Sequence, residues 1–520
     1  MILGTHRSIA VACMILANGF LSVGLAQDTR VPPINKSDFL VQSGCDGANC
    51  HKSAVIATPI WSNAVHIWSD HDPHARAYRS LLTKDSLAIV QKLWGDAQTA
   101  PSQTDDPNYR GFLENNCASC HASELAPVSQ RQQGVDCQSC HGSATVWDPS
   151  HYSSDWRVLG VNRFKDPSDP GRLNMESAWV AARVCGSCHI GELGRVGQVE
   201  FDDGTKAAIG QREVSHKLMA AGHPPTYFEL SHFLLKYPKH WWDQDNVAAA
   251  QVSISQDDKK LSPANARSLD TWRIGKLVNA KQRLELLRNR IGKAEWPEFT
   301  EHRCSSCHHP IDVGTQKING SDLAFAEWDA WYLEQVDLAI AITQLPLTLK
   351  LEATNSSVTE FSESKAGNSD SDSIKEWNDH RSLLQKSMLD PRTIHQDTSM
   401  QLNLEKTCTA MIDFLGVIIA NEYPIVDDAS IALVKNAWAN RVKTEPVPTS
   451  WESAVQLKLA AQAIFFHGRS DNSYPPFPLD KWDLPIDMWK RQQAMPYESS
   501  RDFDWNEFNK QLRELINSLK

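Results

Sequence analysis

Beyond its first 26 residues the sequence has no apolar run long enough to cross a bilayer, and it has no excess of positive charge. The formal net charge of −11 argues against nucleic acid and against an anionic membrane surface as partners. It favours a protein partner with a basic docking patch. Apolar residues make up 41% and charged residues 22%, as in ordinary globular proteins. The 520 residues suffice for two to four domains.

The only long apolar stretch lies at the N-terminus and predicts a secretory signal peptide over residues 1–26. His6 and Arg7 give a weakly basic start, and the stretch ends in a small-x-small cleavage site at Ala26. Asn18 interrupts the run, which favours cleavage over the alternative, an uncleaved membrane anchor. Membrane association is expected only in that second case. We therefore expect a periplasmic or otherwise exported protein.

Twelve cysteines in an exported chain would first suggest disulfides, but their spacing indicates another use. Four segments have the order Cys-x-x-Cys-His: Cys117-Ala-Ser-Cys120-His121, Cys137-Gln-Ser-Cys140-His141, Cys185-Gly-Ser-Cys188-His189 and Cys304-Ser-Ser-Cys307-His308. In such a motif two thiols bind the two vinyl groups of one porphyrin, and the following histidine ligates the iron. A zinc site has no need of a histidine directly after each cysteine pair. The pattern predicts covalently bound c-type haem.

A fifth segment has the same order with a wider spacing. Four residues separate Cys45 from Cys50, and His51 follows. Alone, this pair would also fit a disulfide, but beside four regular motifs we expect a fifth haem on a wider loop. The cofactors are then five c-type haems with their iron. Of the two other cysteines, Cys13 leaves with the signal peptide, and Cys408 is expected to be a buried structural thiol.

The proximal iron ligands predicted by these motifs are His51, His121, His141, His189 and His308. The chain has 19 histidines, and removing these five and His6 leaves thirteen for the five opposite, distal positions. The supply permits two histidines per iron, as in haems that only carry electrons, and does not prove it. The distal candidates are His74, His151, His216, His223 and His309, with His66, His71, His232, His240 and His302 in reserve.

Local sequence favours some of these candidates. Asp72 can cap a helix with Pro73 at its first position, which would hold His74 in the first turn. His216 and His223 are seven residues apart, so on one helix they would share a face about 10 Å apart and serve two neighbouring haems. Hydrogen-bonded or surface imidazoles are the alternative for each. Met219 is an alternative thioether ligand, although packing is the commoner role of methionine.

These motifs and their surroundings resemble the multihaem cytochromes of the cytochrome c-554 type. The resemblance covers roughly residues 40–230, on the five segments Cys45–His51, "WSDHDPHARAYRSL", "GVDCQSCHGSA", "VCGSCHIG" and "SHKLMAAGH". It implies periplasmic electron transfer by haems stacked in close pairs. It also implies distal ligation by His74, His151 and His216, and it raises the alternative that the haem of His121 lacks a sixth ligand. The widened first motif, the fifth motif at Cys304 and the long C-terminus depart from the family.

The pattern along the chain predicts a mainly α protein. Residues 27–310 carry all five motifs and are expected to form a loop-rich pentahaem domain, and residues 311–520 a helical domain. Ser, Asn and Asp enrich residues 353–373, which predicts a flexible loop. The expected longer helices are 266–292 with a basic face, 322–351 kinked or ended near Pro346, and an antiparallel set at 398–421, 426–441, 449–467 and 503–519.

An exported electron carrier is the leading functional prediction. The alternative is an oxidoreductase that acts on nitrite, hydroxylamine, tetrathionate or a similar small compound at one five-coordinate haem. No Cys-x-x-Cys-Lys motif, typical of the active haem of pentahaem nitrite reductases, occurs in the chain. A haem-based sensor has little support because no signalling domain follows. The sequence assigns no catalytic residue and leaves a homo-oligomer open.

Overall fold

The structure is a computed structural model. It describes residues 51–52, 60–142 except 125 and 127, 173–194, 198–200, 206–208, 210–240, 269–302 except 294, 295 and 297, 328–344, 369–388, 396–420, 451–466, parts of 431–442, and residues 510 and 512. This part of the chain is mainly helical, which confirms the predicted fold class at that level. The exception is a short antiparallel pair, β1 (Gln198–Glu200) with β2 (Lys206–Ala208), in which Val199 lies opposite Ala207. None of the described helices is long and apolar enough to cross a membrane.

Short helices make up the N-terminal part of the fold. They are η2 (Ile60–Asn63), α1 (Ala64–His71), η3 (Pro73–Arg76), α2 (Ala77–Ser80), α3 (Lys84–Leu93), α4 (Pro107–Asn116), α5 (Ala118–His121), η4 (Val128–Gln133) and α6 (Cys137–His141). Side-chain caps begin several of them: Asp72 caps η3, Thr83 caps α3, Asp106 caps α4 and Asp136 caps α6. Each cap satisfies backbone N–H groups that the first turn leaves unpaired. Capping thus fixes where these short helices begin.

The central helix α13 (Leu269–Arg290) lies where the sequence predicts a helix, but its predicted basic face is wrong. Four of its six cations are buried, namely Arg273, Lys276, Arg283 and Arg290, and the other two are half-buried. Arg283 Nε donates to Asp329 Oδ2 at 2.5 Å, and Lys276 Nζ donates to Gln456 Oε1 at 2.8 Å. A buried cation is tolerated when it is paired and hydrogen-bonded. The helix is therefore enclosed by its neighbours.

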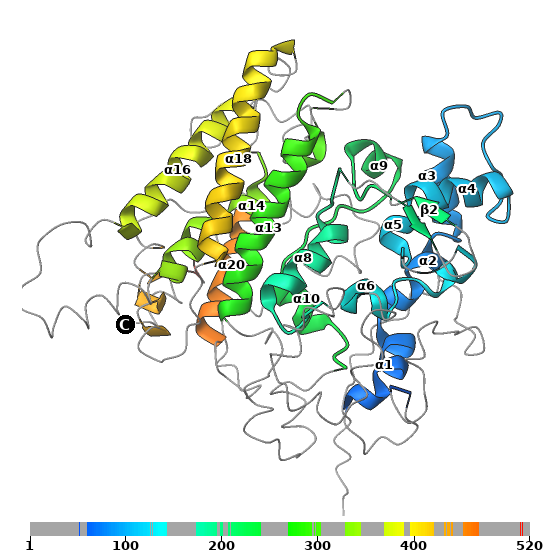
Figure 1. The fold of residues 1–520 in the computed structure, drawn as a ribbon, viewed down its shortest axis with the longest axis horizontal. Helices are drawn as coiled ribbons and strands as arrows, with labels where there is room; N and C mark the ends of the chain where they lie inside the picture. Colours follow the sequence, from blue (N-terminus) through cyan, green and yellow to red (C-terminus); the bar gives the residue numbers. More distant parts are fainter. Residues whose placement is uncertain are drawn as a thin grey trace, which may run out of the picture.

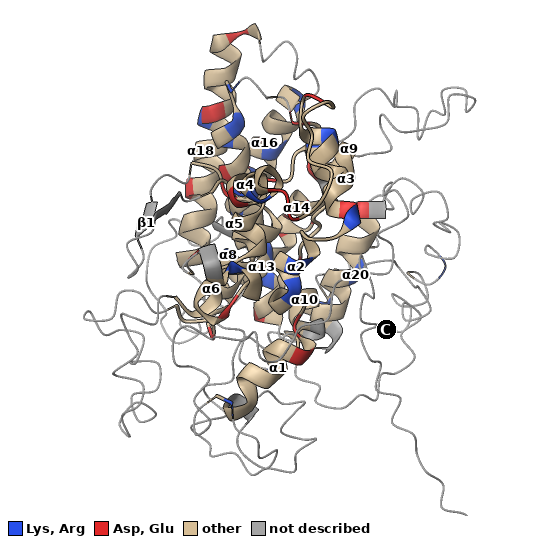
Figure 2. Ribbon diagram, turned by 90° about the vertical axis from the view of Figure 1, so that its right-hand side faces the viewer, with Lys and Arg blue, Asp and Glu red and all other residues tan. Residues whose placement is uncertain are grey.

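Those neighbours are α8 (Ala178–His189) and α10 (Leu230–Lys236) on one side, and α14 (Ala330–Leu333), α18 (Thr398–Ala420) and α20 (Trp451–Phe466) on others. The outer helix α16 (Ser369–Met388) packs on α18 (Figure 1). Both signs of charge occur along α16 and α18 (Figure 2). One continuous apolar core includes residues from α8 through α20.

Two predicted elements of the C-terminal part are wrong. The helix expected over 322–351 is interrupted, because α14 ends at Leu333 and Gln335 has a positive φ of 63° before residues 336–344 become helical again. The loop expected over 353–373 is shorter, since α16 already begins at Ser369. The helices predicted at 398–421 and 449–467 are confirmed as α18 and α20. The helix predicted at 503–519 lies largely outside the described residues, and the domain boundary at 310 stays a prediction.

Candidate haem site

Three of the five motifs lie in the described part of the chain, and all three are helical. They form α5, α6 and the C-terminal end of α8. On a helix, residues i, i+3 and i+4 share a face. Both thiols and the imidazole of a Cys-x-x-Cys-His motif therefore point to one side, as one porphyrin requires. All six cysteines of these motifs are half-buried.

The widened first motif cannot use this geometry, because positions i, i+5 and i+6 do not share a helix face. His51 lies in a turn, and its carbonyl accepts a hydrogen bond from Val65 N at 3.0 Å. Several residues of the predicted haem sites lie outside the described part of the chain. They are Cys45, Cys50, Cys304, Cys307, His308 and the distal candidates His151 and His309.

Each described motif histidine of the regular type lies beside a histidine from a distant segment. The ring centroids are 6.0 Å apart for His74 and His189, 6.3 Å for His121 and His223, and 6.1 Å for His141 and His240. The planes of the two rings are nearly perpendicular, at 88°, 84° and 73°. All six rings are half-buried. Motif and remote histidines are thus brought together in three separate pairs.

These separations fit an iron held between two imidazoles. Two metal–nitrogen bonds of about 2.0 Å, with about 1.1 Å from each nitrogen to its ring centre, give a centroid separation of about 6 Å. An edge-to-face contact of two aromatic rings has a similar separation. What distinguishes the three pairs is their composition, since each contains one histidine that directly follows a cysteine pair. The residues present therefore fit the predicted cofactor.

The hydrogen bonds of the rings agree with this use. The Nδ1 atoms of His121 and His223 lie 3.0 Å from Ala77 O and 2.8 Å from Pro224 O, and His74 Nδ1 lies 2.8 Å from Asp72 Oδ1. Each of these three rings therefore turns its Nδ1 to an oxygen acceptor, which leaves Nε2 as the metal-binding nitrogen. An oxygen acceptor bonded to the other ring nitrogen fixes the tautomer and orientation of a ligating histidine.

Burial keeps most of these rings neutral. It lowers the pKa of His189 to about 3 and those of His141 and His223 to about 4, with nearby histidines adding to the effect. A neutral imidazole has the lone pair that a metal ligand needs. The pKa of His74 shifts the other way, because the hydrogen bond and charge of Asp72 outweigh the opposing effect of burial.

His74 is held from two directions. The predicted cap is confirmed, since the Asp72 carboxylate accepts from His74 N at 2.9 Å at the start of η3, which is a 3-10 helix. The His74 carbonyl in turn accepts from Val135 N at 3.0 Å, just before α6. A side chain at Gly134, whose φ is +79°, would collide with that carbonyl. Only glycine permits this approach, which fixes His74 relative to the motif of α6.

The predicted shared helix face of His216 and His223 is wrong. Helix α9 (His216–Ala221) ends at Gly222, whose φ is 124°, so His223 lies beyond the helix. His216 lies instead at the start of α9, where its backbone N donates to Glu298 Oε1 at 2.7 Å and its ring contacts Phe299 at 6.0 Å. The two histidines therefore face different parts of the molecule.

Arg212 joins two motifs, and sequence reasoning missed it. Its guanidinium donates to Ser119 O at 2.8 Å and to Ser187 Oγ at 2.6 Å, and it pairs with Glu124 at 3.1 Å. Ser119 lies inside the motif of α5 and Ser187 inside the motif of α8. No spacing rule connects residue 212 to either motif.

The thiols of these two motifs also meet. The thiols of Cys120 and Cys188 interact, which raises the pKa of Cys120 and, with the charge of Arg212, lowers that of Cys188. Cys140 lies close enough to Cys185 for the two charges to interact. The attachment points of the three motifs are therefore neighbours in space.

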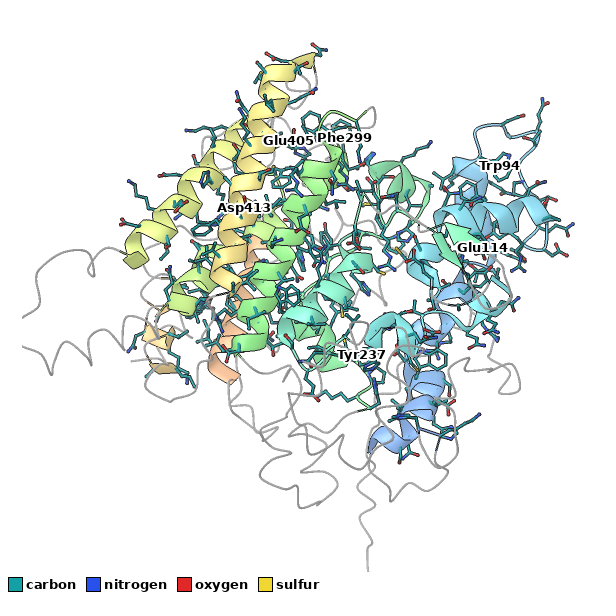
Figure 3. All side chains as sticks on the ribbon, viewed as in Figure 1. Trp94, Glu114, Tyr237, Phe299, Glu405 and Asp413 are labelled. Atoms are coloured by element: carbon teal, nitrogen blue, oxygen red, sulfur yellow. The ribbon has the colours of Figure 1, made fainter. Side chains whose placement is uncertain are left out.

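His240 is a further residue that the sequence singled out only as a reserve. It follows α10 and contacts both His141 and the ring of Tyr237. Tyr237 also donates its hydroxyl to Asp72 Oδ2 at 2.5 Å, so it lies between two of the histidine pairs. Figure 3 places Tyr237 in the lower part of the view and Phe299 in the upper part.

Comparison of the chain with family models, with curated proteins and with solved structures finds no match. Among the described residues, no group of three or more His, Cys, Asp or Glu side chains is arranged to hold a metal ion. Two histidines per iron form no such group, because the porphyrin supplies the other ligands. The resemblance to the cytochrome c-554 type therefore rests on the motifs and the segments around them.

Proposed function

We propose that the chain is an exported multihaem c-type cytochrome that carries electrons through five covalently bound haems. The observation that carries this proposal is the set of three histidine pairs, each joining a motif histidine to a remote one at about 6 Å. A haem iron with two histidine ligands exchanges single electrons and has no open position for a substrate. Pairing at His121 favours the carrier over an enzyme, because the family resemblance raised that site as the five-coordinate one.

In this proposal the chain's own residues attach the haems, orient the histidine ligands and shield them from water. The cysteines in and next to α5, α6 and α8 would hold the haems through thioether bonds, and the paired histidines would each supply a nitrogen ligand to the iron. Phe228 stacks on His189 at 5.4 Å, and Phe233 lies edge-on to it at 5.2 Å. These rings keep water from the imidazole and restrict its rotation. The protein thereby limits how much the site reorganises when its charge changes.

The spacing of the attachment points supports transfer between sites. Cys120 and Cys188 are within hydrogen-bond distance, and Arg212 fixes their motifs to one another. Cofactors attached at neighbouring thiols have edges close together, which favours rapid electron exchange. Electrons would enter and leave through a protein partner, and the net charge of −11 favours one with a basic docking patch.

His216 is assigned to the fifth motif in this proposal. Its partners Glu298 and Phe299 precede Cys304 by only a few residues of sequence, and Phe299 also contacts His302. The remote histidines His74, His223 and His240 are already paired with His189, His121 and His141. A ligand at the start of α9 would connect the fifth site to the rest of the array.

Two measurements on the mature protein test the proposal. Mass spectrometry should find five covalent haems, and the oxidised protein should give only low-spin signals in electron paramagnetic resonance. Nearly perpendicular imidazoles predict highly anisotropic low-spin signals rather than rhombic ones. A count of four with Cys45 and Cys50 joined by a disulfide would remove the first site. A high-spin signal that changes on adding nitrite or hydroxylamine would overturn the pure carrier. Cys408 belongs to no motif, so the variant Cys408→Ser serves as the control and should leave the haem count unchanged.

A further inference from the structure

His74 and His223, the remote histidines of two pairs, differ in the acceptor that their Nδ1 atoms face. His74 Nδ1 faces the carboxylate of Asp72 at 2.8 Å, whereas His223 Nδ1 faces the backbone carbonyl of Pro224, also at 2.8 Å. The distances are equal, but one acceptor is charged and the other is neutral. A hydrogen bond to an ionised acceptor is roughly twice as strong as one to a neutral acceptor.

Asp72 is built into the fold. Its side chain is only 2% exposed, and both of its oxygens are engaged. Oδ1 accepts from the backbone N and faces the ring of His74, and Oδ2 accepts from the hydroxyl of Tyr237 at 2.5 Å. The carboxylate is therefore held in a fixed orientation behind the imidazole of His74.

We infer that Asp72 is a positioning residue that makes the His74–His189 haem lower in reduction potential than the His121–His223 haem. This inference rests on the proposed function. A carboxylate that accepts the Nδ1 proton increases electron donation from Nε2 and favours the oxidised, more positive iron. The step concerned is the gain of one electron from a redox protein, with no bond made or broken. Pro224 O offers His223 no comparable charge.

The variant Asp72→Asn tests the inference directly. The amide oxygen of asparagine can still accept from His74, so the cap and the ring orientation are kept while the charge is removed. In the fully loaded protein, one midpoint potential should rise by a tenfold change in the redox equilibrium, about 59 mV for one electron. For each of the other haems, the redox equilibrium should change by less than threefold. The affected haem should stay low-spin.

The matched control is Asp70→Asn. It removes the same charge two residues earlier, from a carboxylate that accepts from Ser69 Oγ at 2.9 Å. If the effect of Asp72 acted only through net charge, both variants would shift the potential alike. An equal shift in the two variants, or no shift in Asp72→Asn, would overturn the inference.

A second test needs no change at Asp72 and stands if that variant fails to fold. The variants His74→Ala and His223→Ala should each convert one low-spin signal to high-spin, which identifies the two haems in the wild-type spectrum. In a redox titration of the wild-type protein, the signal lost in His74→Ala should titrate at the lower potential. The reverse order would contradict the inference.

The two proposals fail in distinguishable ways. If the proposed function is wrong, the purified wild-type protein lacks covalent haem or gives no pair of low-spin signals that these variants remove. If only the inference is wrong, five haems are present and low-spin, and the midpoint potentials do not change in Asp72→Asn.

Discussion

Two regions of the molecule bury their residues in different ways. The described residues between 269 and 466 share a continuous apolar core in which side chains such as Trp272 and Leu415 are fully enclosed. Residues 60–142 have only a small apolar cluster around Tyr109 and Leu113, and their motif cysteines and histidines are half-buried. The first region is stabilised by its own side chains. The second has short helices and a small core, so under the proposed function the haems would supply much of its apolar contact area.

Helix α8 belongs to both regions. One side packs on α13, where Gly186 is so close to Gln282 that a side chain would collide with it. Its last turn carries the motif that ends in His189 and faces α6 (Figure 1). The long helices therefore act as a fixed support from which one attachment motif projects toward the other two. This division gives four predictions.

Preventing haem attachment should have the largest effect. Protein produced without residues 1–26, in a compartment that does not attach haem, should lose ordered structure over residues 60–142 because the small cluster there cannot stabilise it alone. Helices α13, α18 and α20 should stay folded. Limited proteolysis with mass spectrometry would locate the cuts. Equal protection of both regions would show that the N-terminal helices need no cofactor.

A cavity in the long helices should be the next largest effect. Leu415→Ala removes a fully buried side chain of α18 and should lower the free energy of unfolding by about 2–5 kcal/mol. The exposed neighbour Val417, with 59% of its surface accessible, is the matched control, and Val417→Ala should cost less than about 0.5 kcal/mol. Denaturant unfolding followed by circular dichroism measures both. The haem absorption should be unchanged in the folded variant; a shifted Soret band would mean that the two regions are not separate.

Sequence predicted the parts of the site that depend on neighbours in the chain. Attachment motifs are local, and so is the cap that Asp72 provides for His74. The pairing of His240 with His141 could not be predicted, because it depends on how α10 packs. The prediction of one helix carrying both His216 and His223 was wrong because the helix ends at Gly222, which adopts a left-handed conformation.

The same limit applies to charge. Cations on α13 repeat as on an exposed helix, so a basic face was predicted. Their carboxylate and amide partners, among them Asp329 and Gln456, come from segments far along the chain. Arg212 is the corresponding case in the motif region. A long-range polar partner leaves no periodic trace in the sequence.

Arg212→Ala should give a moderate effect confined to the motif region. The variant leaves Ser187 Oγ and the carboxylate of Glu124 without the guanidinium and should destabilise the contact between α5 and α8 by about 1–3 kcal/mol. Hydrogen exchange should speed up in both motif helices and stay unchanged in α18. The control is Arg183→Ala, which removes an exposed pair with Glu192 and Glu285 on the outer part of α8. Equal effects of the two variants would show that Arg212 is an ordinary surface cation.

The smallest effect concerns pH in the long helices. Burial lowers the pKa of Lys276 from 10.5 to about 7, although the charges of Glu334, Glu229 and Asp329 oppose that shift and Arg381 adds to it. Between these values the unfolded chain holds the extra proton, so the contribution of Lys276 makes the protein more stable as pH rises, by about 1 kcal/mol from pH 7 to 8. Burial raises the pKa of Asp329 only to about 6, below this window.

Lys276→Met keeps the length of the side chain and removes the titrating group, so the difference between wild type and variant isolates this contribution. Unfolding free energies measured at pH 7 and 8 should differ more in the wild type than in the variant. A parallel pair of curves would mean that Lys276 keeps its proton in the folded protein. In that case its hydrogen bonds to Trp331 O and Gln456 Oε1, at 2.9 and 2.8 Å, and the surrounding carboxylates would be enough to hold a full charge inside the core of α13.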